Sequence, residues 1–204
     1  MKRNKCGDIN IKSCSSTLKH ERKKCLTMEQ IVSTYKKVYL PAAHAEWRWF
    51  ASAKNIKEAI ARAVSSELNE DGNYMSSHQR RIGRAKLAKA AIYFGRMAEE
   101  YASATNFEQV YAITKSVSTP KELRIGELAR YDFSTRVSAF LNLKPESVYL
   151  HAGTRTGARN LGYLHENEIQ KTELIQKHPE LETLSPDDIE NLLCIFKDNL
   201  TPPK

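Results

Sequence analysis

Apolar side chains recur every three or four residues along most of this 204-residue chain, and this spacing constrains the fold more than any other feature. The pattern is clearest in Leu87, Ala90, Phe94, Met97 and Tyr101. Residues at these intervals share one face of an α-helix, whereas a half-buried strand alternates apolar and polar residues. The sequence contains no such alternating series. It therefore predicts an all-α fold, a single multi-helix domain of about seven to nine helices.

Capping residues and prolines divide this domain into helices. A serine, threonine, asparagine or aspartate placed just before an apolar series accepts hydrogen bonds from the first free backbone N–H groups of a helix. Thr27 with Gln30 has the pattern of a capping box, and Pro41 is expected to end that first helix. Asn55 and Asn106 are the expected caps of two later helices, and Asp187 is one of the acids expected in the first turn of the last helix. Val148-Tyr149-Leu150 is a short candidate strand. The expected helices cover residues 28–40, 42–53, 56–68, 77–104, 107–117, 132–143, a short stretch from Thr154, 166–177 and 186–200.

The first 26 residues differ from the rest of the chain. Residues 1–26 show no period and are expected to form a basic, irregular N-terminal arm before the helical domain, 27–204. Of the net charge of +8, residues 1–30 contribute +5, which leaves +3 for the remainder. A basic arm favours nucleic acid or other polyanions as partners. The alternative is a solvated terminus without a partner.

Several functional classes lack their sequence signatures. Cys6, Cys14, His20 and Cys25 offer zinc-ligand chemistry, but their gaps are wider than the close pairs of structural zinc sites. Reduced, exposed thiols are the simpler interpretation, and neither a metal nor a cofactor is expected. No apolar run reaches the ~20 residues of a membrane helix, and the charged start lacks the apolar segment of a secretory signal. The expectation is a cytoplasmic protein without a membrane partner.

The segment from His151 to Gly162 is the most unusual part of the chain. It holds three of the eight glycines, together with threonines and arginines. Glycine lets the backbone approach a ligand closely, the first N–H groups of a helix attract an anion, and arginine binds phosphate in a bidentate way. The alternative is a tightly packed corner whose arginines pair with nearby acids. The candidate phosphate- or anion-binding residues are Thr154, Arg155, Thr156, Gly157 and Arg159.

His151 precedes this turn and is the candidate proton carrier. Tyr131 and Asp132 lie upstream, and the three are the candidate catalytic residues: meeting across a cleft, they would form a carboxylate–imidazole couple for general base catalysis. A purely structural role is also possible for Asp132. It has the position of a helix cap, and it precedes Arg136 by four residues, the favourable order for a surface ion pair.

Arg80, Arg81 and Arg84 give the longest expected helix a basic start. These are the candidate nucleic-acid-binding residues, because a cluster of cations contacts phosphates without reading base sequence. The alternative is an ordinary exposed charged face.

Three functional hypotheses follow. The leading one is a binding protein for a phosphate-bearing partner, with DNA or RNA as the expected ligand. The second is an enzyme that acts on a nucleotide or another small anionic substrate through the His/Arg site. The third is a helical protein–protein interaction module that forms a homo-oligomer through the Leu87–Tyr101 seam.

Overall fold

The computed structural model describes residues 26–66 and 77–201. Helices dominate these residues, and the two strands form one small sheet, so the prediction of an all-α, single multi-helix domain is confirmed. The expected N-terminal arm, with its candidate zinc ligands, and the end of the third expected helix lie outside the described residues. In the described ranges no helix is long and apolar enough to cross a membrane.

The elements follow in the order α1 (Met28–Thr34), a π-helical turn (Tyr35–Tyr39), α2 (Leu40–Ala51), α3 (Ile56–Ser65), α4 (Ser77–Ile82), α5 (Arg84–Gly95), α6 (Ala98–Ser103), α7 (Phe107–Ser116), a 3₁₀ turn (Lys121–Leu123), α8 (Glu127–Leu141), β1 (Ser147–Tyr149), α9 (Ala152–Asn160), β2 (Glu168–Gln170), α10 (Lys171–Lys177), a 3₁₀ turn (Pro179–Leu181), α11 (Pro186–Phe196) and a final 3₁₀ turn (Lys197–Asn199).

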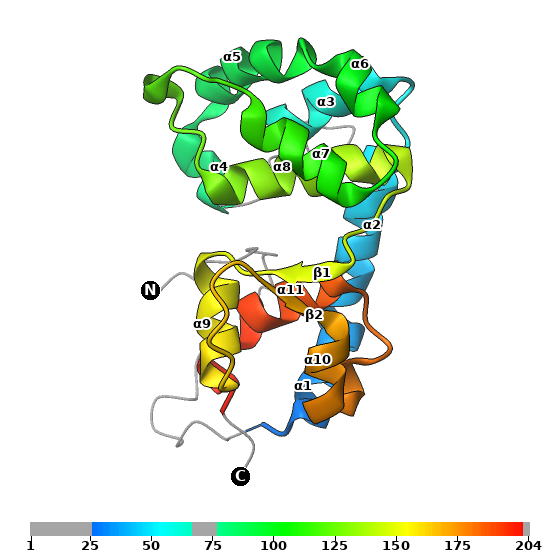
Figure 1. Cartoon of the computed structure of the whole chain (residues 1–204), viewed down its shortest axis with the longest axis vertical. Coiled ribbons are helices and arrows are strands. Elements are labelled where there is room, and N and C mark those ends of the chain that lie inside the picture. The colour runs from blue at the N-terminus through cyan, green and yellow to red at the C-terminus, as the bar shows by residue number, and fades with distance from the viewer. Residues whose placement is uncertain (1–25, 67–76, 202–204) are drawn as a thin grey trace.

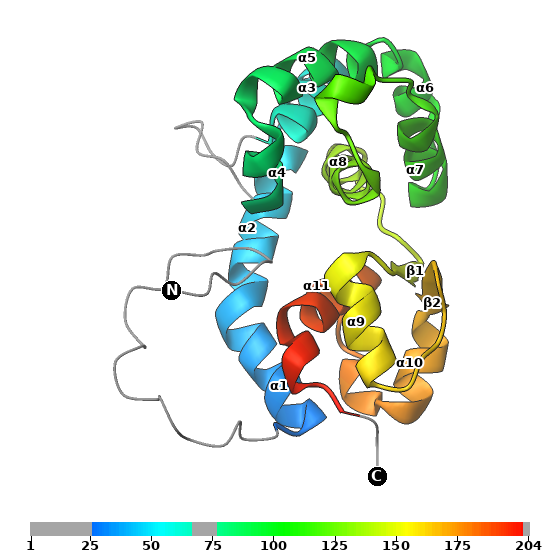
Figure 2. The same ribbon diagram turned by 90° about the vertical axis from the view of Figure 1, so that its left-hand side faces the viewer.

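These elements form two lobes (Figures 1 and 2). The upper lobe contains α3 to α8, and the lower lobe contains α1, the two strands and α9 to α11. The long α2 runs from one lobe to the other. Each lobe has its own hydrophobic core. Phe94 and Phe133 pack edge to face in the upper core, with ring centroids 5.4 Å apart, and Leu174 and Leu193 are among the buried residues of the lower core.

The expectation that Pro41 ends the first helix is wrong, because the helical path continues past Leu40. Thr27 and Gln30 form the expected capping box, with the Gln30 N–H donating to the Thr27 hydroxyl at 3.2 Å. The chain then passes through the π-helical turn directly into α2, where Pro41 lies in the first turn. A proline removes one backbone donor and crowds the preceding turn. The wider π turn accommodates both effects, so the helical path continues.

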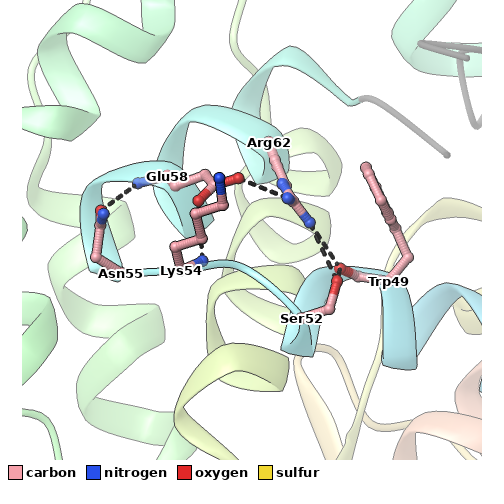
Figure 3. A network of polar contacts seen from close by, with 6 residues as sticks. All are labelled: Trp49, Ser52, Lys54, Asn55, Glu58 and Arg62. Carbon is pink, nitrogen blue, oxygen red and sulfur yellow. Dashed lines mark hydrogen bonds and ion pairs between the residues drawn. The ribbon is translucent and has the colours of Figure 1, made fainter. Parts of the chain in front are cut away.

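A network of polar contacts holds the corner between α2 and α3 (Figure 3). Asn55 caps α3 as expected, accepting from the Glu58 N–H at 3.0 Å. Arg62 donates to the Glu58 carboxylate at 2.5 Å, to the Trp49 carbonyl at 3.1 Å and to the Ser52 hydroxyl at 3.2 Å. Its guanidinium also stacks on the Trp49 ring, 4.1 Å from the centroid. Charge, hydrogen bonding and stacking together fix the angle at which α3 leaves α2.

The single long helix expected over 77–104 is wrong. The chain forms α4, α5 and α6 instead, with breaks at Gly83, which has a φ of +91°, and at Met97. Breaking the helix lets its apolar side follow the curved core of the upper lobe. Leu87, Phe94 and Tyr101 are each at most 1% exposed there. These three side chains of the seam thus pack inside the chain, and Met97 is half-buried.

Val148-Tyr149 forms a strand as expected, but its partner was not predicted. β1 pairs antiparallel with β2, with Val148 opposite Ile169. The charged helix expected from Glu166 therefore begins later, at Lys171. Residues 168–170 become a strand because Ile169 buries its side chain beside β1 while its neighbours face solvent.

Candidate functional site

Helix α8 of the upper lobe faces β1, α9 and α11 of the lower lobe (Figure 1), and this junction contains the candidate catalytic residues. Helix α8 begins at Glu127, and Gly126 is its N-cap. The expectation that Asp132 caps a helix is therefore wrong, because Arg130 N–H already donates to the Gly126 carbonyl at 3.1 Å. Tyr131 and Asp132 lie inside the helix, and their side chains can serve the junction. Asp132 accepts a hydrogen bond from Gln79 Nε2 of α4 at 2.8 Å.

Arg136 is not part of a surface ion pair as expected, because its side chain is only 5% exposed. It donates to the Ala63 carbonyl at 3.2 Å and to the Ser66 hydroxyl at 3.1 Å, and its Nε lies 3.6 Å from Glu46 Oε1. Arg136 thus connects α8 to α2 and to the end of α3. A buried guanidinium needs such partners, since leaving the charge uncompensated would be strongly destabilising.

His151 is the N-cap residue of α9 and is 3% exposed. Among the described residues, neither of its ring nitrogens has a hydrogen-bond partner. Its Nδ1 lies 4.0 Å from Glu127 Oε1, which is too long for a hydrogen bond. Burial lowers the pKa of His151, although the nearby carboxylates of Glu127 and Asp132 oppose this shift. A neutral imidazole offers one N–H donor and one acceptor nitrogen.

Tyr131 packs against His151, with ring centroids 4.4 Å apart. The Tyr131 side chain is 3% exposed, and its hydroxyl has no hydrogen-bond partner in the described part of the chain. Burial raises the pKa of Tyr131 well above its ordinary value, and the carboxyl groups of Glu190, Asp187 and Asp132 add to this shift. The hydroxyl therefore remains protonated. Phe107, Tyr111 and Tyr149 complete an aromatic cluster around the Tyr131 ring.

Glu190, on α11, is a member of this site that the sequence interpretation missed. It is 8% exposed and hydrogen-bonds to the Thr154 hydroxyl of α9. The pKa of Glu190 is raised to about 8, mainly by burial; the hydrogen bond from Thr154 opposes this shift, and the charges of Asp132 and Asp187 add to it. Its carboxyl group is therefore mostly protonated at neutral pH. One signal was available in the sequence: Glu190 precedes Leu193 by three residues and Cys194 by four, so a helix places this acid beside two apolar side chains.

Asp187, in the first turn of α11, was also missed. Its Oδ1 is buried and has no hydrogen-bond partner in the described ranges, while its Oδ2 lies 3.9 Å from Lys144 Nζ. The sequence interpretation gave Asp187 only the role of an acid at a helix start. Three contacting pairs lie at this junction: Gln79 with Asp132, Tyr131 with His151, and Thr154 with Glu190. These six residues and Asp187, whose charge raises the pKa of Tyr131 and of Glu190, are called the junction cluster.

The residues of the candidate anion site point in different directions. Helix α9 starts at Ala152, earlier than expected, which buries Thr154 and Gly157. A Cβ on Gly157 would lie 2.3 Å from the Leu193 carbonyl oxygen, so this glycine permits close packing of α9 on α11. Arg155 donates to the carbonyls of Leu150 at 2.8 Å and Glu166 at 2.9 Å. Of the five candidate anion-binding residues, only Thr156 and Arg159 are exposed.

Arg81 and Arg84 are exposed at the start of the basic segment. The Arg80 side chain lies outside what the structure describes. Residues 77–98 contain six Lys or Arg and no acid. Helix α4 also supplies Gln79, whose fully buried amide reaches Asp132, so the basic segment borders the junction cluster directly.

The junction cluster combines groups suited to proton transfer. A protonated carboxyl group in Glu190 and a neutral imidazole in His151 have the acid and base forms that general acid–base catalysis uses near neutral pH. No group of three or more His, Cys, Asp or Glu side chains in the described residues is arranged to hold a metal ion.

Comparison with known proteins adds no likeness to this geometry. No protein-family model, no curated protein and no solved structure matches the chain. What the protein does is therefore inferred from its own residues.

Proposed function

We propose that the protein is an enzyme that acts on a nucleotide, free or within a nucleic acid, through acid–base chemistry at the junction of its two lobes. One observation carries this proposal. The Tyr131 hydroxyl and both His151 ring nitrogens are buried between the lobes without hydrogen-bond partners among the described residues. An unpaired buried polar group costs about 1–3 kcal/mol, so a stable fold retains several at one place for a reason other than stability. Ligand binding is such a reason.

In this proposal each group has a distinct role. Neutral His151 is the general base, and protonated Glu190 is the general acid. The Asp132 carboxylate stabilises the imidazolium that forms when His151 accepts a proton, consistent with its effect of raising the pKa of His151. Arg81 and Arg84 hold the phosphate outside the cluster, as exposed cations do without reading base sequence.

The chemical step is tested by incubating the full chain with mononucleotides and, separately, with oligonucleotides, and identifying products by mass spectrometry. We expect wild-type protein to convert at least one of these substrates. The His151→Gln variant is expected to be at least about 100-fold slower, which is the lower range for loss of a general base. His178→Gln is the matched control, because His178 is also buried and has an unpartnered ring nitrogen, but it packs beside Tyr163 of the lower core and not against Tyr131. Folded wild-type protein that converts no nucleotide, or equal loss in both variants, contradicts the proposal.

The phosphate contacts are tested by measuring oligonucleotide affinity against salt concentration. The double variant Arg81→Gln/Arg84→Gln is expected to bind more weakly and to show a shallower slope, by about 1.4 for single strands, because two phosphate contacts are lost. Lys36→Gln/Lys37→Gln removes the same charge from exposed residues of the π-helical turn and serves as the control. Equal slopes for both double variants would count against a role for Arg81 and Arg84.

Nucleic-acid binding without catalysis is a second candidate function. The acid-free basic segment 77–98 favours it, because electrostatic attraction to phosphates needs no reactive group. The two candidates separate in the same assays. A binding protein would show the salt-dependent affinity and its loss in the Arg81/Arg84 variant, but no product with any nucleotide.

A further inference from the structure

We infer that helix α5 of the upper lobe is a docking surface for duplex DNA, and that its exposed face lies in the major groove. This inference rests on the proposed function for the class of ligand, and it adds the form of the nucleic acid and the helix that contacts it. The surface is separate from the junction cluster, because α5 runs along the outer edge of the upper lobe (Figures 1 and 2).

Helix α5 buries only a narrow side of its surface. Leu87, Ala90 and Phe94 are its residues in the upper core, and each is at most 1% exposed. At 3.6 residues per turn, these three side chains fall within about 60° of one another. The opposite side is exposed from one end of the helix to the other. Helix α5 therefore protrudes from the lobe, and a partner can contact it along about 18 Å.

The exposed side of this helix carries cations and no acid. It is called the α5 face and consists of Arg84, Ala85, Ala88, Lys89, Ile92 and the C-cap residue Arg96. Arg81 on α4 is also exposed and precedes it in the chain. Such a surface attracts a polyanion, and it gains affinity by displacing the counterions that surround the phosphates.

The acids near this helix border the α5 face without belonging to it. They are Glu58 on α3, Glu122 on the turn packed against α5, and Glu99 and Glu100 at the start of α6. The Glu58 carboxylate is bonded to Arg62, and Glu122 directly follows Lys121. Three further acids, within 67–76, lie outside the described residues. The α5 face itself thus presents only positive charge to a ligand.

The composition of the α5 face favours a duplex over a single strand. Proteins that bind single strands stack the bases on aromatic side chains. The exposed residues of α5 include no aromatic side chain, and Tyr93 is half-buried, with the Arg96 guanidinium 5.1 Å from its ring centroid. A duplex requires no stacking, because a helix contacts its phosphates and the edges of its paired bases.

The shape of the α5 face fits the major groove of DNA. This groove is about 12 Å wide and admits an α-helix, whereas the major groove of an RNA duplex is too narrow for side chains to read. Ala85 and Ala88 are small, so the backbone of α5 can approach the base edges closely. Ile92 lies opposite the buried side and is 61% exposed, which suits contact with thymine methyl groups. A membrane surface would need a broad apolar face instead.

Fluorescence anisotropy of the full chain with a labelled DNA duplex tests the form of the ligand. The competitors are a DNA single strand and an RNA duplex of the same sequence, and vesicles of phosphatidylserine and phosphatidylcholine. At one salt concentration, we expect the DNA duplex to bind at least about tenfold more tightly than each competitor, because only its groove accepts the helix. A smaller preference over any of the three overturns the inference.

The cations of the α5 face are tested through the salt dependence of duplex affinity. Lys89→Gln/Arg96→Gln should lower the slope of log affinity against log salt concentration by about 1.8, because two phosphate contacts are lost. Lys36→Gln/Lys37→Gln removes the same charge from exposed residues of the π-helical turn and should leave the slope unchanged. Equal slopes for the two double variants overturn the inference.

Ile92→Ala tests the groove contact separately from charge. It removes an apolar side chain and keeps a strong helix former, so thermal unfolding should stay as in the wild type. Duplex affinity should fall about fivefold or more at every salt concentration with an unchanged slope, since an apolar contact releases no counterions. Leu164→Ala is the matched control, because Leu164 is 83% exposed between α9 and β2 of the lower lobe. Equal affinities of these two variants overturn the placement of α5 in the groove.

These binding measurements separate the inference from the proposed function. If nucleotides are converted while the DNA duplex is not preferred, the proposed function stands and the inference fails. If the duplex binds through the α5 face while no nucleotide is converted, the inference stands and the proposed chemistry fails.

Discussion

The ring of Tyr131 on α8 packs against the imidazole ring of His151 at the start of α9, with ring centroids 4.4 Å apart, and this contact joins the two lobes. Both side chains are almost fully buried, and both have polar atoms without hydrogen-bond partners in the described residues. The contact is therefore favourable for its apolar ring surfaces and unfavourable for its polar atoms.

The Tyr131 hydroxyl is expected to contribute nothing to stability. Tyr131→Phe should leave the free energy of unfolding unchanged or raise it by up to about 1 kcal/mol, because it removes a buried hydroxyl that has no partner. Urea denaturation measures the change. Tyr101→Phe is the contrast, because the Tyr101 hydroxyl bonds to Thr114 at 2.9 Å and its loss should cost about 1 kcal/mol. Equal losses in the two variants would show that the Tyr131 hydroxyl has a partner within the fold.

Glu190 is expected to make stability depend on pH in the direction opposite to an ordinary carboxylate. Its pKa is raised from 4.5 to about 8 by burial, so the folded protein binds this proton more tightly than the unfolded chain. The resulting stabilisation is complete below pH 4.5 and is lost as pH rises to about 8. Glu190→Gln cannot ionise. The difference in free energy of unfolding between this variant and the wild type should therefore increase by several kcal/mol, in favour of the variant, across this interval. At higher pH the difference should stay constant.

Denaturation series at pH 3, 4, 5, 6.5, 8 and 9 check this gain and cover the range in which Glu58 ionises. Glu58→Gln provides a control of opposite sign, because hydrogen bonds from Lys54 and Arg62 lower the pKa of Glu58. Its variant should lose stability relative to the wild type as pH rises through the range in which Glu58 ionises. A difference between wild type and Glu190→Gln that does not change with pH would show that Glu190 is ionised in the folded protein.

Gly157 is expected to tolerate no side chain. Gly157→Ala places a Cβ 2.3 Å from the Leu193 carbonyl oxygen, and the resulting displacement of α9 from α11 should cost about 1–3 kcal/mol. Gly95→Ala is the control within a helix, since no atom lies within 4 Å of the added Cβ. That variant should be stabilising by about 0.5–1 kcal/mol, because alanine loses less backbone entropy on folding. Thermal unfolding of the two proteins should show shifts of opposite sign.

Arg155 and Arg159 are expected to differ in their contribution to stability, although both were predicted to bind an anion. Arg155→Gln removes hydrogen bonds to the Leu150 and Glu166 carbonyls and should lower the free energy of unfolding by about 1–3 kcal/mol. Arg159 is exposed, so Arg159→Gln should change the free energy of unfolding by less than about 0.5 kcal/mol. If Arg155→Gln is as stable as the wild type but loses affinity for phosphate, its guanidinium serves a ligand rather than the fold.

Features that depend on neighbouring residues were predictable from the sequence. The caps at Thr27, Asn55 and Asn106 form where they were expected, and each accepts a hydrogen bond from an N–H in the first turn of its helix. A strand was expected at 148–150 and forms at 147–149, and the short helix expected from Thr154 begins at Ala152. Errors arose where packing overrode the local pattern. Gly126 replaced Asp132 as the cap of α8, and the curved upper core broke the expected long helix at Gly83.

By itself, the sequence determined the helical class of the fold, most helix starts and the candidacy of Tyr131, Asp132 and His151, because residue type, spacing and capping act over a few neighbouring residues. Only the tertiary structure decided that Tyr131 packs against His151 and that Glu190 accepts a hydrogen bond from Thr154. Burial, the loss of hydrogen-bond partners and the shifted pKa values all depend on which helices pack together across the lobes. Residues distant in the chain acquire these properties only when the folded protein removes them from water.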